Sequence, residues 1–436
     1  MIANLILAGA ATAALAAGDA QPAPAPVPAA TQQVDPHAVV SQVRRTIAER
    51  YVLPERRPAL DAVLAEGQNS GRYNVREPAV LAERINSDLA RVGRDGHLNF
   101  SYNPERFAML TARTGDDRPD FSVIEQDVRR RNHGVRALRL LPGNVRYLEL
   151  SDWMFIGEES ETALNAAMQF LSGGDAVIID IRRNGGGTGR AVQQVISHFL
   201  EAGRPLMTFY RGNEAIQMPP SLTGLSGMVG KPLYVLTSGG SASASEEFVG
   251  HVLGYRLGEV VGGNTAGAAF SNGLYPVAGG FVLSVSEQRP VLAATGGDWE
   301  RTGFAPTIPA PVESALETAH IHALRRLAAA GTPRAGELEA LAAGLEAVAR
   351  PGTPGAPLAA YAGTYGDRQI ILEGGQLWYR EGTRARRRLV PVGGHAFVLA
   401  DDPVQRLVFQ RAGGRIPAFD LGLANGPVVG RYERSR

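Results

Sequence analysis

Residues 176–181, with the sequence AVIIDI, constrain the fold of this chain more than any other stretch. Five of the six side chains are apolar, and they do not alternate with polar ones as they would in a strand with one wet face. A continuous apolar run of this length predicts a strand whose two faces are both covered, as in the parallel sheets of α/β proteins.

Strand-like and helix-like segments alternate around this run, over about residues 140–330. Repeated strand–helix units predict an α/β core. The expected strands are 146–150, 176–181, 233–237, 259–262 and 282–285, and the expected helices are 161–171, 190–200 and 313–330.

The rest of the chain differs in pattern from this core. Apolar residues at helical spacing predict a helical subdomain over residues 36–93. Short alternating runs between glycine turns predict a small antiparallel β domain over residues 358–436. The core is assigned to residues 94–330, with a polar excursion at 103–133. The Pro/Gly/Ala-rich residues 331–357, with one helical patch at 338–349, are interpreted as a linker.

The first 35 residues have the pattern of an exported protein. Residues 1–20 are mostly apolar and alanine-rich and end in small residues, as in a secretory signal peptide, and residues 21–35 are typical of a flexible Pro/Ala linker. The apolar part is too short for a membrane-spanning helix. The sequence therefore predicts export, to a bacterial periplasm, without a stable membrane span.

The composition argues against several kinds of site. The chain has no cysteine, which excludes disulfides, thiolate metal ligands and a cysteine nucleophile. A net charge of +1 without a Lys/Arg block gives no support to nucleic-acid binding. No metal ion or other cofactor is predicted. The chain has one lysine, Lys231, and its other basic side chains are arginines.

Residues 231–248, KPLYVLTSGGSASASEEF, combine a short apolar strand, a glycine-containing turn and the start of a helix. The helix start carries three serines, Ser241, Ser243 and Ser245. A serine there lies near free backbone N–H groups that can stabilise an oxyanion. The alternative is that these serines cap the helix or fill small spaces in the packing.

Two further segments could supply the rest of a catalytic site. His97 follows a tight turn at the start of an expected strand, where it could act as a base. The glycine run 185–187 could provide oxyanion donors, and it lacks the Gly-Lys-Ser/Thr ending of a nucleotide-binding loop. Taken singly, such a histidine is more often exposed or capped, and such glycines more often form a turn before a helix.

Three motifs, in this order along the chain, resemble those of the C-terminal-processing, or tail-specific, serine proteases. They are DIRRNGGGTG (180–189), TSGGSASASEEF (237–248) and VVGGNTAG (260–267). Two segments are similar to one branch, the relatives of the tricorn core and of the interphotoreceptor retinoid-binding protein repeats: RVGRDGHLNF (91–100) and RNHGVRALRLLPGNVRYLEL (131–150). The resemblance covers about residues 36–330 and implies a core of the crotonase/Clp-protease type that cleaves peptides near their C-termini.

The resemblance also implies a role for each matching residue. Ser243 corresponds to the nucleophile and His97 to the general base of the tricorn-like branch. Glu300 corresponds to a glutamate that orients or polarises the base, with a solvated surface glutamate as the alternative. The oxyanion donors correspond to backbone N–H groups of Gly185, Gly186 and Ala244.

Two departures from the family pattern bear on the mechanism. The bacterial processing proteases place a lysine base shortly after the VVG strand, where this chain has Ala268. Lys231 precedes the strand that leads to Ser243, and five extended residues span about 16 Å, so a serine–lysine dyad is not expected. Residues 103–143 are too short and irregular for a PDZ domain, so substrate tethering by such a domain is not expected either.

The sequence thus predicts an exported serine peptidase that acts on peptides or unfolded C-termini, with Ser243 as nucleophile and His97 as base. One alternative is a non-catalytic binding protein for apolar ligands or peptides, and another is an esterase that uses the same residues. Pure binding needs neither Ser243, His97 nor the glycine run, which favours an enzyme. The C-terminal β domain is expected to serve substrate gating, partner docking or stabilisation.

Overall fold

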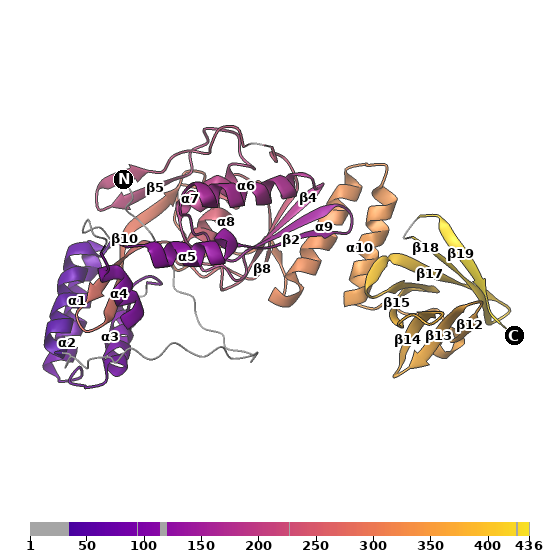
Figure 1. Ribbon diagram of the computed structural model, residues 1–436, viewed down its shortest axis with the longest axis horizontal. Coiled ribbons are helices and arrows are strands. Elements are labelled where there is room, and N and C mark those ends of the chain that lie inside the picture. Colours follow the sequence, from indigo (N-terminus) through magenta and orange to yellow (C-terminus); the bar gives the residue numbers. More distant parts are fainter. Residues whose placement is uncertain (1–34, 94, 114–119, 226, 424–425, 436) are drawn as a thin grey trace.

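The computed structural model describes residues 35–93, 95–113, 120–225, 227–423 and 426–435. The expected signal peptide, residues 1–20, and the expected Pro/Ala linker, apart from its last residue, lie outside the described residues. The described chain runs from a helical part through a central α/β core to a C-terminal β domain, as Figure 1 shows. No helix in these ranges is long and apolar enough to cross a membrane.

The centre of the core is a six-stranded sheet made of β2 (Val135–Leu141), β3 (Val145–Leu150), β4 (Ala176–Asp180), β7 (Leu233–Thr237), β8 (Gly258–Gly262) and β11 (Ile308–Pro309). Its strand order is β11-β8-β7-β4-β3-β2, and neighbouring strands are parallel except for β2 and β3. Every residue of the inner strand β4 is buried, which explains its uninterrupted apolar sequence.

Helices cover both faces of this sheet. They are α6 (Glu158–Ser172), α7 (Gly189–Ile196) and α8 (Ala244–Gly254) on one face and α9 (Ala315–Ala329) on the other. Side chains of β4 alternate between the two layers: Val177 and Ile179 join the core under α6–α8, and Ile178 joins the core under α9. The α/β core predicted from the alternating pattern is confirmed.

A second sheet, of five strands, carries part of the site. It consists of β1 (Asn99–Tyr102), β5 (Met207–Arg211), β6 (Glu214–Gln217), β9 (Ser271–Val277) and β10 (Phe281–Leu292). The long strand β10 pairs with β1 and β9 along its first part and with β5 at residues 289–292. The polar excursion 103–133 contains two helices, α4 (Pro104–Thr111) and α5 (Ser122–Arg130).

The N-terminal part is helical, as predicted. Its helices are α1 (Pro36–Arg50), α2 (Arg57–Asn69) and α3 (Pro78–Gly93). Their apolar faces pack on the second sheet, where Ile47, Leu64 and Ile85 share a core with Phe100 and Phe281. This part therefore supports β1, the strand that begins just after His97.

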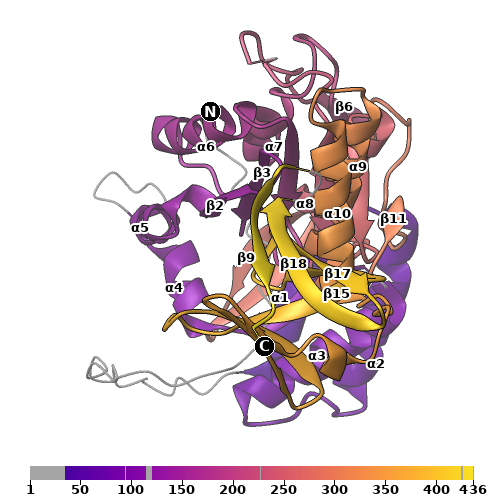
Figure 2. The same cartoon turned by 90° about the vertical axis from the view of Figure 1, so that its right-hand side faces the viewer.

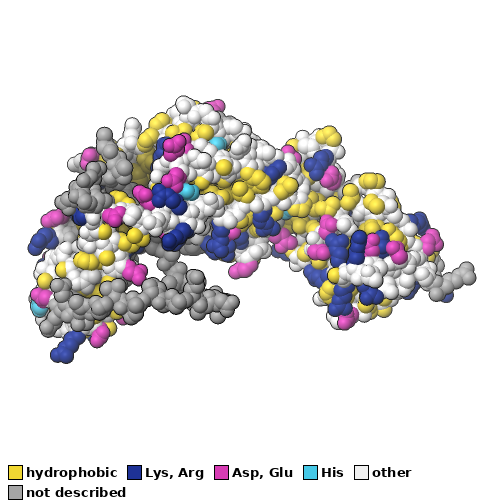
Figure 3. Space-filling view, in the orientation of Figure 1, with side chains coloured by type: hydrophobic (Ala, Val, Ile, Leu, Met, Phe, Trp, Pro, Cys, Tyr) yellow, Lys and Arg dark blue, Asp and Glu magenta, His cyan; other side chains and the backbone are white. Residues whose placement is uncertain are grey.

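The C-terminal part is an antiparallel sheet in which each strand pairs with the next, and it confirms the predicted β domain. A bridge between Tyr365 and Arg434 brings the two ends of the sheet together, so that it nearly closes into a barrel. Figure 2 shows this domain in front, and Figure 3 shows Lys and Arg side chains gathered on it. The strands are β12 (Gly363–Tyr365), β13 (Arg368–Glu373), β14 (Gln376–Glu381), β15 (Arg387–Gly393), β16 (Ala396–Leu399), β17 (Asp402–Ala412), β18 (Arg415–Leu423) and β19 (Val428–Glu433).

The helical patch expected within residues 331–357 is part of a 15-residue helix, α10 (Ala335–Ala349), which is packed and therefore differs from a loose linker. Leu338 and Leu341 are buried in a core that they share with α9. On the other side, a Cβ on Gly344 would come within 2.8 Å of the carbonyl oxygen of Pro403 in β17. The helix therefore packs against both of its neighbours. Short 3₁₀ helices join some elements: η1 (Pro54–Arg56), η2 (Asn132–Gly134), η3 (Val312–Ser314) and η4 (Leu358–Ala360).

Candidate active site

Ser243 lies at the turn between β7 and α8. Its backbone has φ +55° and ψ −117°, a conformation that residues with a side chain rarely adopt. Its N–H donates to the carboxylate of Glu246 in the first turn of the helix, at 3.0 Å. The turn thus holds a partly exposed serine in a strained conformation at a helix N-terminus, an arrangement that presents nucleophilic serines in hydrolases.

The fully buried Glu246 fixes this turn to the loop after β8. Its two oxygens accept hydrogen bonds from Thr265 Oγ1 (2.6 Å) and from the N–H groups of Gly267 (2.7 Å), Ala268 (2.8 Å) and Ser243. These bonds compensate a carboxylate that water does not reach. This role of Glu246 was not predicted from the sequence. Its spacing of three residues from Ser243, that of a capping box, is the signal that could have indicated it.

The other two serines of this stretch are fully buried and have structural partners. Ser241 Oγ donates to the carbonyl oxygen of Ile181 at 2.8 Å. Ser245 Oγ donates to the carbonyl oxygen of Asn184 at 2.7 Å. Both hydroxyls therefore tie the start of α8 to the segment that follows β4.

Gly186 packs directly against Ser243. A Cβ on Gly186 would come within 2.8 Å of Ser243 Cβ, and its φ of +116° is one that other residues rarely adopt. Its N–H donates to Asn184 Oδ1 at 3.0 Å, so this group is engaged within the chain rather than free to bind an oxyanion. Asn184 is fully buried, and sequence analysis did not single it out.

Gly185 and Ala244 are the remaining predicted oxyanion donors. Gly185 has open space where a side chain would lie, and it lines the same hollow as His97. Ala244 is the first residue of α8, where N–H groups have no partner within the helix. Both donors therefore lie beside Ser243, one in the chain that follows β4 and one in the helix itself.

His97 is buried, with 6% of its surface exposed, and it lines a hollow of about 180 Å³. Its Nδ1 has no hydrogen-bond partner within the described residues. Burial lowers the pKa of the imidazole below its usual 6.5, and the charge of Asp95 acts in the opposite direction. The net effect is a lowered pKa, because removal from water disfavours the imidazolium more than Asp95 favours it.

Ser243 lines a second hollow that adjoins the first. Ala242 and Ala268 line the hollow of His97, whereas the next residues along the chain, Ser243 and Ala269, line the second. The structure thus brings His97, Gly185 and Ser243 to adjoining surfaces. No hydrogen bond joins His97 to Ser243 in the described part of the chain, and such contacts in free enzymes often tighten only when substrate binds.

Two carboxylates support the segments around His97. Asp95 Oδ1 accepts from the N–H of His97 (2.8 Å) and from Ser286 Oγ (2.9 Å). Glu300 Oε2 accepts from the N–H groups of Ala269 (2.7 Å) and Phe270 (3.1 Å). These bonds fix the start of β1 and the start of β9 on either side of the site.

Glu300 is held in an environment that disfavours its charge. Burial, and then the charge of Asp95, raise the pKa of Glu300 to about 7, while its backbone hydrogen bonds act in the opposite direction. Its Oε1 is buried without a hydrogen-bond partner. The alternative of a solvated surface glutamate therefore does not describe this side chain.

Lys231 lies at the opposite end of β7 from Ser243. Its Nζ donates to the carbonyl oxygens of Ser172 (3.0 Å) and Gly174, at the C-terminal end of α6. The side chain is thus used to bind the end of a helix, where a cation is favourable. A serine–lysine dyad is not formed.

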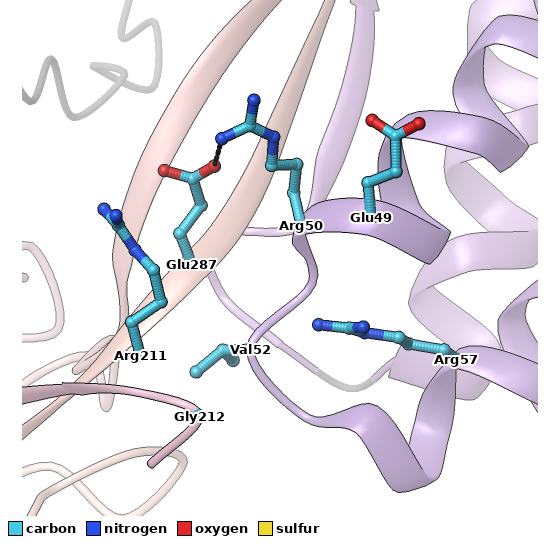
Figure 4. Close-up of a pocket in the computed structure, with 7 residues that line it drawn as sticks. All are labelled: Glu49, Arg50, Val52, Arg57, Arg211, Gly212 and Glu287. Atoms are coloured by element: carbon cyan, nitrogen blue, oxygen red, sulfur yellow. Dashed lines mark ion pairs between the residues drawn. The ribbon is translucent and has the colours of Figure 1, made fainter. Parts of the chain in front are cut away.

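A polar hollow also lies apart from Ser243 and His97. It has a volume of about 330 Å³ and lies between α1 and the strands β5 and β10. Figure 4 shows Arg50 facing Glu287 in this hollow, with Arg57 also pointing inward. The ion pair between Arg50 and Glu287 measures 3.9 Å. Arg57 donates to the carbonyl oxygen of Tyr51, and none of the predicted site residues lines this hollow. Within the described ranges, no group of three or more His, Asp or Glu side chains could hold a metal ion.

Comparison with known proteins gives a match in the core. Residues 144–310 match the family model of Peptidase family S41. A CtpA-like serine protease of Staphylococcus epidermidis is 22% identical over 185 residues, which are 42% of this chain and 36% of that protein. The chain therefore spans only about a third of the length of this relative.

Two solved structures illustrate the resemblance. The photosystem II D1 C-terminal processing protease has 18% sequence identity and a TM-score of 0.41, covering 64% of this chain and 94% of that one. Mature CPAF has 13% identity and a TM-score of 0.44, covering 67% of this chain and 97% of that one. The region matched by the family model contains Ser243, its glycine run and Glu300. Residues 144–310 thus match the model of Peptidase family S41, in agreement with the resemblance to C-terminal processing proteases that the three motifs indicated.

Proposed function

We propose that this protein is an exported serine peptidase in which Ser243 attacks the carbonyl carbon of a peptide bond. The observation that carries the proposal is the strained turn at Ser243, which presents one partly exposed hydroxyl at the N-terminus of α8 while Ser241 and Ser245 are buried and bonded. The match of the region around this turn to a peptidase family model supports the choice of a peptide bond as substrate.

The reaction proceeds in two stages at this site. His97 accepts the proton of Ser243 Oγ as the oxygen attacks, and it then gives the proton to the leaving amine. Burial keeps the pKa of His97 below 6.5, so that the imidazole is neutral and can accept a proton at pH 7. The N–H groups of Gly185 and Ala244 stabilise the oxyanion. Water then hydrolyses the acyl-enzyme with the same base.

Glu300 and Asp95 are positioning residues in this scheme. Neither bonds to the imidazole ring, but Asp95 holds the backbone of His97, and Glu300 holds the backbone beside the second hollow. Peptides or unfolded C-termini are the proposed substrates, because an extended chain can reach a serine that lies between two open hollows.

The test combines covalent labelling with hydrolysis. A fluorophosphonate probe should label the wild type, and Ser243→Ala should lose both labelling and peptide hydrolysis while its melting temperature stays near that of the wild type. Ser172→Ala, a change of an exposed serine at the end of α6, is the control and should keep both.

Several outcomes would contradict the proposal. Label on Ser241 or Ser245 would show that the nucleophile is wrong. Hydrolysis of esters but not of peptides would indicate an esterase. A protein that neither labels nor hydrolyses would indicate a binding protein. Export is tested separately, by fractionating a bacterium that produces the full chain; the mature form should begin near residue 21 and lie in the periplasm.

A further inference from the structure

The second hollow, beside Ser243, contains polar groups that the proposed reaction does not use. Its walls include the apolar side chains of Met207, Phe209 and Pro290. Glu247 and Trp299 also line it, although both are almost completely buried, with 4% and 2% of their surfaces exposed. A carboxylate in such apolar surroundings is costly unless something compensates it.

Glu247 and Trp299 each bury a polar atom that has no partner within the described residues. These atoms are Glu247 Oε1, an acceptor, and Trp299 Nε1, a donor. His251 Nε2 lies 3.7 Å from Glu247 Oε1, which is too far for a hydrogen bond. Buried polar atoms are rarely left in this state, so each can gain a hydrogen bond when a ligand or water enters.

Glu247 turns one carboxylate oxygen, Oε2, toward the hollow, while Oε1 lies on the side of His251. Its Oε2 lies 3.3 Å from the position that a Cβ on Gly189 would take, and Gly189 lines the hollow too. Glu247 also lies four residues after Ser243, one helical turn along the same side of α8. A substrate side chain attached next to the attacked carbonyl can therefore reach it.

We propose that this hollow binds the substrate side chain on the acyl side of the scissile bond, and that Glu247 and Trp299 select serine or threonine there. This inference rests on the proposed peptidase function. The hydroxyl of such a side chain donates to the Glu247 carboxylate, whose Oε2 lies on the side of the hollow, and accepts from Trp299 Nε1.

The size of the hollow sets the length of the selected side chain. Its volume is about 30 Å³, room for no more than one or two water molecules. Leucine and lysine are too long for it, and alanine fits but leaves both polar atoms without partners. Because a hydrogen bond to a charged group is among the stronger ones, serine should exceed alanine by roughly 10- to 100-fold in kcat/KM.

The assignment to the acyl side follows from the place of the two hollows. His97, which protonates the leaving amine, lines the other hollow together with Ala242, the residue before Ser243. Ala244, the residue after Ser243, lines the hollow of Glu247. The leaving group and the acyl group thus lie on opposite sides of the nucleophile.

The experiment measures kcat/KM for peptides that differ only in the residue on the acyl side: serine, threonine, alanine, leucine and lysine. The wild type should cleave the serine and threonine peptides best. Glu247→Met should lower kcat/KM much more for the serine peptide than for the alanine peptide, so that the preference of serine over alanine is lost, since a merely structural effect would lower both rates equally. Glu158→Gln, a change of an exposed glutamate on α6, is the control and should keep the wild-type pattern.

The outcomes separate this inference from the proposed function. Cleavage with leucine or lysine as the best residue, or an unchanged serine preference in Glu247→Met, overturns the assignment of the hollow but leaves the peptidase. A wild type that cleaves no peptide and does not label at Ser243 overturns both. If Glu247→Met does not fold, Glu247→Gln replaces it; this variant keeps the shape but loses the charge, and its serine preference should fall several-fold.

Discussion

Replacing Glu300 by glutamine tests whether this side chain is held as a neutral acid near the base. Burial and the charge of Asp95 raise the pKa of Glu300 to about 7, so that the folded protein keeps a proton on this carboxyl group in mildly acidic solution. Glutamine imitates the protonated form, because its carbonyl oxygen can accept from the N–H groups of Ala269 and Phe270 as Glu300 Oε2 does.

The sign and the size of the effect follow from proton linkage. In the unfolded chain the carboxyl group loses its proton near pH 4.5, whereas in the folded protein it does so near 7. The raised pKa therefore contributes stability that is complete below pH 4.5 and is lost as the pH rises through about 7. A rise of this size corresponds to at most about 3 kcal/mol, and solvent screening of a half-buried group reduces this to about 2 kcal/mol.

The assay is urea unfolding followed by tryptophan fluorescence at pH 5, 6, 7 and 8, for the wild type and Glu300→Gln. At pH 5 the two free energies of unfolding should be nearly equal, and at pH 8 the variant should be more stable by about 2 kcal/mol. Glu313→Gln, a change of an exposed glutamate before α9, controls for the loss of a surface charge. Parallel pH dependences of the wild type and Glu300→Gln would refute the reasoning.

Three further predictions concern the residues around Ser243. The rate of hydrolysis should rise with pH through an apparent pKa below 6.5, because burial lowers the pKa of His97. His97→Ala should abolish turnover. A pH–rate profile that rises only near pH 8 would contradict the assignment of His97 as the base. Gly186→Ala should lower kcat by roughly 10²-fold, because the new Cβ would come within 2.8 Å of Ser243 Cβ. The assay measures kcat and the melting temperature of this variant, and full activity would show that the contact is harmless. Glu246→Ala should destabilise the protein by about 3 kcal/mol because it leaves several donors unpaired, and an unchanged midpoint of urea unfolding would count against it.

The elements predicted correctly from the sequence are those whose signal is carried by neighbouring residues. The strand β7 begins and ends where the apolar run 233–237 does, and α9 follows its helical periodicity. The strand β9 was missed, because Ser271–Val277 contains glycine and proline and most of its residues are only partly buried. Its place is fixed by pairing with β10, a contact that no local pattern reports.

The same difference applies to the candidate site. The motifs and their order indicated Ser243 and His97, since a serine at a helix start and a histidine after a tight turn are visible in short segments. The roles of Asn184 and Glu246 were not visible, because their partners lie in other loops of the folded chain. The lowered pKa of His97 was missed for the same reason: burial is a property of the packed protein and not of the residues next to it.

The buried carboxylates explain how two separate sheets can hold one site together. Ser243 follows β7 of the central sheet, whereas His97 precedes β1 of the second sheet. Residues 265–270 run between them, with Glu246 accepting from the N–H of Ala268 and Glu300 from the N–H of Ala269. Because these consecutive N–H groups bond to carboxylates from opposite sides of the site, a shift of this segment would move the environments of the nucleophile and of the base together. The segment therefore couples the nucleophile to the base through its backbone, although its own side chains, alanine and glycine among them, carry no chemistry.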